Sequence, residues 1–197
     1  MSPDSALHEL FSGNVRFRTG RPNARSYDPR ILVEIAHKQE PIAAVVACSD
    51  SRVSPTIILD QPLGSLFECR VPGNVASESA RWVTDMAVTV FRVPLVLVMG
   101  HTGCLAVTSV LESKPSPMAG ALKMEIQGAI YRARSKRARS KPQSDPLITA
   151  IEENARQTAE NLEAACESLR NACVKGECRC VASVYEMESG SLRLLED

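Results

Sequence analysis

Aromatic side chains are scarce in this chain, in which tryptophan, tyrosine and phenylalanine together make up 4% of 197 residues. Its hydrophobic core must therefore be built mainly from Val, Leu, Ile, Ala and Met side chains. Net charge is also absent, because 23 basic side chains balance 23 acidic ones. A neutral chain has no overall electrostatic attraction to nucleic acid or to an anionic membrane, so neither partner is expected.

Long apolar runs are missing as well. No stretch approaches the roughly 18–20 consecutive apolar residues of a membrane-spanning helix, and the N-terminal segment lacks the basic and apolar regions of a secretory signal. The seven cysteines are an odd number, and they occur without an export signal. This pattern favours free thiols or metal ligands over a disulfide framework. We therefore expect a cytoplasmic protein.

The apolar pattern changes repeatedly between strand-like and helix-like segments. The expected strands are 42–47, 66–71, 93–99, 180–186 and 192–195. The expected helices are two pieces within 1–40, one at 77–91 and one from about 147 to 170. This order predicts an α/β fold with a central, mainly parallel β-sheet flanked by helices, an N-terminal helical arm and a C-terminal edge strand.

The length of the chain fits one domain, which we expect to span 1–197. Within it, residues 1–40 form the helical arm, and 41–112 and 147–197 form the α/β core. The intervening residues 113–146 are expected to be a loop and a basic insertion, which includes the helix-breaking stretch 113–120.

Three potential zinc ligands follow two of the predicted strands. Cys48 ends one buried strand, and His101 and Cys104 come in a turn just after another. Zinc takes nitrogen and sulfur ligands, and a catalytic site offers three of them and one open position. Neither Cys48 nor the pair of His101 and Cys104 is by itself a specific sign of a zinc site, because free cysteines are commonly just buried in the core. Parallel sheets bind small molecules and ions beyond the carboxyl ends of their strands. We expect these three residues to meet there.

An acid and a base follow Cys48 directly, at Asp50 and Arg52. Such a pair would hold a carboxylate in one orientation beside a metal. The alternative is an ordinary surface ion pair, which contributes little to stability.

These motifs together resemble a known family. CSDSRVSP (48–55) followed by GHTGC (100–104) is similar to the paired motif of the β-class carbonic anhydrases. The resemblance extends in the same order over nearly the whole chain, through FSGNVRF (11–17), IILDQPLGSLFECRVPGNVA (57–76), IEENARQTAENL (151–162) and VYEMESGSLRLL (184–195).

The resemblance implies a carbonic anhydrase, a zinc lyase that reversibly hydrates carbon dioxide to bicarbonate and a proton. One zinc ion per subunit would be held by Cys48, His101 and Cys104. Asp50 would accept a hydrogen bond from the zinc hydroxide, and Arg52 would keep that carboxylate ionised. In some members of the family the same aspartate closes onto the zinc instead, and this alternative stays open here.

Several further positions are implied to face the substrate. Gln61 corresponds to a glutamine that donates to a substrate oxygen, and the backbone N–H of Leu105 would be a second donor. Arg70, Gly73 and Asn74 would shape the neighbouring wall. The family also implies that the 1–40 arm embraces a second subunit, which predicts a homodimer or a dimer of dimers.

One departure from the family pattern leaves the activity open. Leu105 stands where the family usually has glycine, so a bulky side chain is expected beside the pocket. A hydrolase of carbonyl sulfide or carbon disulfide on the same scaffold is therefore the alternative enzyme. A non-catalytic, zinc-stabilised structural or assembly protein is the alternative from another class, although Asp50, Arg52 and Gln61 argue against it.

Two other clusters call for an interpretation. Residues 131–141 hold six basic side chains, which we interpret as a solvated helix face or loop, with a docking patch for an acidic partner as the alternative. Four cysteines gather near the C-terminus, and we expect them to pack in the core or to have a minor redox role rather than to form a second zinc site. They are Cys166, Cys173, Cys178 and Cys180.

Overall fold

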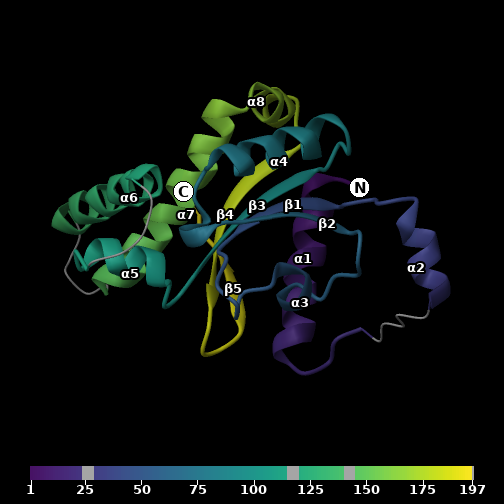
Figure 1. The fold of residues 1–197 in the computed structure, drawn as a ribbon, viewed down its shortest axis with the longest axis horizontal. Coiled ribbons are helices and arrows are strands. Elements are labelled where there is room, and N and C mark those ends of the chain that lie inside the picture. The colour runs from purple at the N-terminus through teal and green to yellow at the C-terminus, as the bar shows by residue number, and fades with distance from the viewer. Residues whose placement is uncertain (24–28, 115–119, 140–144, 197) are drawn as a thin grey trace.

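A five-stranded sheet organises the computed structural model, which describes residues 1–23, 29–114, 120–139 and 145–196 (Figure 1). The strand order is β2-β1-β3-β4-β5, with the first four strands parallel and β5 antiparallel to β4. The strands are β1 (Ala43–Ala47), β2 (Leu66–Arg70), β3 (Leu95–His101), β4 (Arg179–Glu186) and β5 (Ser191–Leu194). The predicted α/β fold with a mainly parallel sheet and a C-terminal edge strand is confirmed.

Helices cover both faces of this sheet. Helices α4, α7 and α8 pack on one face, with α5 and α6 beside them, and α1 and α3 lie on the other (Figure 1). Their bounds are α1 (Pro3–Arg18), α2 (Pro29–Ala36), α3 (Pro55–Ile58), α4 (Glu78–Thr89), α5 (Leu105–Leu111), α6 (Gly120–Arg139), α7 (Pro146–Ala165) and α8 (Glu167–Val174), with a short 3-10 turn η1 (Pro72–Asn74). No helix in the described ranges has both the length and the apolar character to span a bilayer.

The two faces of the sheet carry two separate cores. Successive side chains of a strand point to opposite faces, so Val96 and Val98 of β3 join the larger cluster under α4 and α7. Leu97 and Met99 join a smaller cluster with Leu10 of α1. The two central strands β1 and β3 are buried on both sides, as their continuous apolar runs predicted.

The region between 113 and 146 is mainly helical, which corrects the expectation of a loop. Gly120–Arg139 form α6, while 115–119 and 140–144 lie outside the described residues. Charged residues obscure the apolar face of this helix in the sequence, but Ile126, Ala129 and Ala133 are buried. The predicted helix at 147–170 is also corrected, because Cys166 adopts an extended conformation that separates α7 from α8.

Two basic side chains of the cluster on α6 pair with acidic side chains of α7. Arg132 Nη1 donates to Glu160 Oε2 at 2.6 Å, and Lys136 Nζ donates to Glu153 Oε1 at 2.9 Å. Glu153 is only 4% exposed, so its charge needs these partners. The solvated helix face is therefore partly an interface between two helices of the same chain.

Helix α4 packs on the sheet with most of its apolar surface. Ala80, Thr84 and Ala87 are buried, and Val83 and Phe91 are partly buried against the same core. Trp82 and Val90 are 59% and 64% exposed, so these two large apolar side chains are turned outward.

The FSGNVRF segment attaches α1 to the loop after α3. A Cβ added at Gly13 would lie 1.9 Å from the carbonyl oxygen of Leu59, so no other residue fits there without displacing the backbone. One turn further on, Arg16 Nε donates to Asp60 Oδ2 at 2.5 Å. Between them, Asn14 donates through Nδ2 to a carbonyl of the β4–β5 turn, at Gly190. The motif is thus explained by docking of the helix.

We predict that Gly13→Ala destabilises the folded protein by about 3 kcal/mol, the upper range for overpacked sites, because the new methyl group would overlap the Leu59 carbonyl. Urea unfolding measures the effect. Gly120→Ala is the control, since nothing lies within 4 Å of its added Cβ and alanine favours helices. Equal stabilities of the two variants would contradict the close packing of Gly13 against the Leu59 carbonyl.

Candidate metal centre

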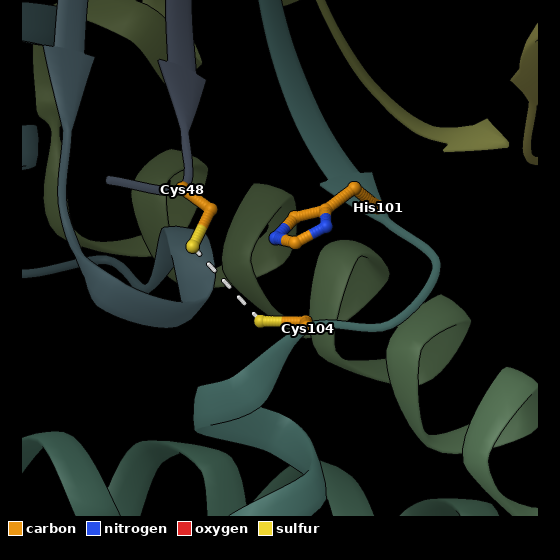
Figure 2. A group of neighbouring side chains, drawn as sticks. All are labelled: Cys48, His101 and Cys104. Carbon is orange, nitrogen blue, oxygen red and sulfur yellow. Dashed lines mark hydrogen bonds between the residues drawn. The ribbon is translucent and has the colours of Figure 1, made fainter. Parts of the chain in front are cut away.

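Three side chains with metal-binding atoms converge at the carboxyl ends of β1 and β3 (Figure 2). Cys48 follows the last residue of β1, and Cys104 immediately precedes α5. His101 is the last residue of β3 rather than a residue after it, because the strand continues two residues beyond the predicted end at 99. The ligand atoms of all three lie within 4.8 Å of one another, and all three residues are buried.

The turn between His101 and Cys104 is tied to the end of β4. The Thr102 amide donates to the Tyr185 carbonyl at 3.0 Å, and the Thr102 hydroxyl accepts from the Met187 amide at 2.9 Å. Gly103 has a φ of 68°, a left-handed conformation that glycine adopts without strain. The HxxC spacing therefore folds back tightly enough to bring both side chains to one point.

The imidazole of His101 offers an unused nitrogen to this point. Its Nδ1 lies 3.0 Å from the Thr102 carbonyl oxygen, so Nδ1 carries the proton and Nε2 has the free lone pair. Nε2 is buried without a hydrogen-bond partner among the described residues. Figure 2 shows the ring directed toward the two sulfur atoms. A buried polar atom without a partner costs free energy, and a bound cation would remove that cost.

A hydrogen bond joins the side chains of Cys48 and Cys104. Cys48 Sγ and Cys104 Sγ are 3.9 Å apart. The hydrogen bond from Cys104 lowers the pKa of Cys48 most, burial opposes this, and His101 and the Gly73 amide at 3.4 Å support the thiolate. The same hydrogen bond and burial raise the pKa of Cys104. Removing the proton of this hydrogen bond leaves two thiolates and an imidazole, a ligand set that suits zinc.

Asp50 and Arg52 form a close ion pair beside the cluster. Arg52 Nε donates to Asp50 Oδ1 at 2.9 Å, and Arg52 Nη2 donates to Asp50 Oδ2 at 2.8 Å. These bonds lower the pKa of Asp50 well below its usual range, against a smaller opposite effect of burial, and His101 adds to the lowering. The carboxylate is mostly buried, with 14% of its side chain exposed, whereas that of Arg52 is 61% exposed.

Gly73 of η1 contacts the cluster through its amide, which donates to Cys48 Sγ. Gly73 has a φ of 71°, and an added Cβ would approach Ile126 Cδ1 to 2.9 Å, so glycine is required there. Asn154 of α7 donates to the Gly73 carbonyl at 2.7 Å and so holds in place the residue whose amide donates to Cys48 Sγ. The sequence did not assign this role to Asn154, although the segment 151–162 carried a resemblance. Asn74 is buried, and its Nδ2 has no partner among the described residues.

Comparison with known proteins identifies the family. Residues 43–192 match the family model described as carbonic anhydrase. The chain belongs to the β-class carbonic anhydrase family. This matched segment includes Cys48, His101 and Cys104.

Individual relatives agree with this assignment. Carbonic anhydrase 2 of Mycobacterium tuberculosis is 40% identical over 110 residues, which cover 56% of this chain and 53% of that protein. The chain thus spans about half the length of this relative. A carbonic anhydrase of Pseudomonas aeruginosa is 27% identical over 214 aligned positions, covering 96% of this chain and 88% of that one. Among solved structures, a tetrameric β-carbonic anhydrase of Sordaria macrospora superposes with a TM-score of 0.74 at 18% identity, covering 98% of both chains, and so supports the fold.

Two residues that the family resemblance assigned to the substrate are not packed against the cluster within this β-carbonic anhydrase chain. Gln61 is 3% exposed, and its Nε2 donates to Glu9 Oε1 at 3.2 Å and to the Leu59 carbonyl at 2.9 Å. Leu105 begins α5 and is 74% exposed, so its side chain faces solvent. The fold brings together Cys48, His101, Cys104, Asp50, Arg52 and Gly73, and leaves these two side chains elsewhere.

We predict that Asn154→Leu lowers metal affinity by about 10-fold, because Gly73, whose amide donates to Cys48, loses the donor that holds its carbonyl. Competition with a chromogenic chelator measures the affinity. Asn161→Leu is the matched control, since Asn161 makes a similar bond from the same helix to Glu125, at 2.9 Å. The same affinity loss in both variants would show that the effect is not specific to Gly73.

Proposed function

We propose that this chain catalyses the reversible hydration of carbon dioxide to bicarbonate and a proton, with one zinc ion per subunit held by Cys48, His101 and Cys104. The observation that carries the proposal is the buried Nε2 of His101, which has no hydrogen-bond partner among the described residues and lies within 4.8 Å of two cysteine sulfur atoms that are 3.9 Å apart. Family membership supports the reaction, and the chemistry of the ligand set supports the metal.

Each group near the cluster has a definable task. Zinc, when bound, would lower the pKa of a water molecule so that a nucleophile is available near neutral pH. Asp50 remains ionised because Arg52 neutralises it, and its oxygen lone pairs accept a hydrogen bond that orients the attacking oxygen. Burial of Cys48, His101 and Cys104 limits access of bulk water to the ligands.

The alternative activities give different predictions for the same site. A hydrolase of carbonyl sulfide or carbon disulfide was suggested by Leu105, but this side chain faces solvent within one chain and does not narrow the cluster. A purely structural zinc site would not require a carboxylate held by two parallel bonds from Arg52. Carbon dioxide hydration is therefore the activity that the site favours.

We also propose that the chain works in the cytoplasm as a homodimer or a dimer of dimers. All seven cysteines are free, which suits a reducing compartment. Helix α2 lies at the periphery of the fold, and its Ile31, Leu32 and Val33 are 37%, 46% and 64% exposed (Figure 1). A second subunit would cover these side chains. Any donation from Gln61 to a substrate would then involve the neighbouring subunit and the exchange of one of its present bonds.

We predict that Cys48→Ser and His101→Ala abolish both zinc binding and carbon dioxide hydration, because each removes one of three ligands. Asp50→Ala should keep the zinc and reduce turnover by at least about 100-fold, the range of general acid–base contributions. Metal analysis and stopped-flow hydration assays measure both quantities.

The control for Asp50→Ala is Asp4→Ala. Asp4 also forms a close ion pair with an arginine, Arg179. Arg179 is the first residue of β4, at the end of the strand that lies away from the metal centre. This variant should retain zinc and full turnover. Full activity of Asp50→Ala would remove that residue from the mechanism, and faster turnover of carbonyl sulfide than of carbon dioxide would favour the alternative hydrolase.

We predict that the hydration rate rises with pH between about 6 and 9. Two thiolates donate more charge to zinc than imidazoles do, so the bound water is expected to be less acidic than in an all-histidine site. The pKa of Asp50 is lowered, so this group stays ionised throughout the range and does not contribute to the profile. Stopped-flow measurements in matched buffers test this, and a flat profile would contradict it.

A further inference from the structure

Arg70 connects the metal centre to the edge of the sheet. It is the last residue of β2, and its partner across the parallel ladder is Ala47, the residue before Cys48. Its Nε donates to the carbonyl of Cys48 at 3.2 Å, and its Nη2 donates to the carbonyl of Asp50 at 2.6 Å. One guanidinium group thus holds the peptide of a metal ligand and the peptide of the carboxylate residue.

This connection differs in kind from the bonds between Asp50 and Arg52. Those two residues are two positions apart, so their ion pair lies within one loop and moves with that loop. It fixes the carboxylate relative to Arg52, but not relative to Cys48, His101 or Cys104. Arg70 lies on a separate strand that is paired to β1, so its two bonds can fix the whole loop relative to the sheet.

Backbone bonds alone hold this loop only partly. The Ser49 amide donates to the Val71 carbonyl at 3.3 Å, which is the last contact that continues the β1–β2 ladder. The carbonyl of Asp50 accepts from the Val53 amide within the same turn, at 3.0 Å. Within the described residues, Arg70 is the side chain from another element that binds the carbonyls of both Cys48 and Asp50.

We infer that Arg70 is a positioning residue of this site: it fixes residues 48–52 so that the Cys48 sulfur and the Asp50 carboxylate keep one relative orientation. The planar guanidinium is suited to this task, because its separate N–H groups reach two carbonyls at once, whereas lysine presents a single ammonium group. The part that concerns the metal stands on the geometry alone, and the part that concerns turnover rests on the proposed function.

The test compares Arg70→Met, which keeps a long side chain without donors, with Arg70→Lys. Both variants and the parent protein are loaded with cobalt(II), whose absorption bands report the geometry of thiolate coordination. We expect Arg70→Met to shift these bands, to weaken cobalt affinity by about 10-fold, and in the zinc form to lower kcat by about 10-fold or more with little change in KM. Arg70→Lys should restore part of each loss.

Arg179→Met is the matched control. Arg179 is also a partly exposed arginine at the end of a strand, and its Nη1 donates to Asp4 at 2.6 Å, far from the cluster along β4. It should leave the cobalt spectrum, the affinity and the turnover unchanged. A general effect of removing a surface arginine would appear equally in Arg179→Met and would count against the inference.

A double variant separates the two contacts of Arg70. In the Asp50→Ala background the carboxylate is gone, so Arg70→Met should reduce turnover much less than in the parent protein while still shifting the cobalt bands. If Arg70→Met reduces turnover by the same factor in the Asp50→Ala background as in the parent protein, Arg70 does not act through Asp50. The part of the inference that concerns turnover would then be wrong.

Other outcomes distinguish this inference from the proposed function. Unchanged cobalt spectra, affinity and turnover in Arg70→Met would overturn the inference and leave the proposed activity intact. Parent protein that binds zinc but does not hydrate carbon dioxide would overturn the activity, while the cobalt measurements would still decide the role of Arg70. Circular dichroism verifies that each variant folds. If Arg70→Met does not fold, Arg70→Lys provides the test. A cobalt spectrum of Arg70→Lys that is identical to that of the parent protein would then overturn the inference.

Discussion

A buried imidazole nitrogen without a partner in the described part of the chain, beside two hydrogen-bonded cysteine side chains, is the constraint on which this site depends. Such a group is costly in the absence of a cation and is well satisfied in its presence. Its members come from the ends of two adjacent parallel strands, so the cluster exists only when β1 and β3 are in register. Folding of the sheet and assembly of the ligand set are therefore the same event.

Polar groups around the ligands are satisfied by side chains from distant parts of the chain. Asn154 of α7 holds the Gly73 carbonyl, and Thr102 accepts from the backbone after β4. Arg70 does the same for two carbonyls at the end of β1. Each contact joins elements far apart in sequence, which makes the site rigid without any ligand belonging to a long loop. Outer contacts of this kind orient metal ligands and tune their affinity.

The parts of this fold that could be predicted were those with a local pattern. Continuous apolar runs located the buried strands, and the adjacent Cys, His, Asp and Arg residues located the cluster at their ends. Helix α6 was missed because its basic residues, such as Arg132 and Lys136, conceal a narrow apolar face and pair with α7 only in three dimensions. The exposure of Trp82 on α4 could not be predicted, because the residue pattern does not show which apolar side chains a helix turns outward. The contacts of Arg70 and Asn154 are to backbone carbonyls, which leave no mark in the residue pattern.

The distribution of charge explains why a site with two thiolates needs Asp50 and Arg52 as a pair. A divalent cation and the thiolates of Cys48 and Cys104 together carry no net charge, so the centre attracts an anion less strongly than one with neutral ligands alone. An unpaired carboxylate beside it would make the site anionic and would oppose the formation of bicarbonate. Arg52 cancels that charge while leaving the lone pairs of Asp50 available, because its bonds use only part of their acceptor capacity. The pair of Asp50 and Arg52 thus orients a hydrogen bond at the site without adding net charge to it.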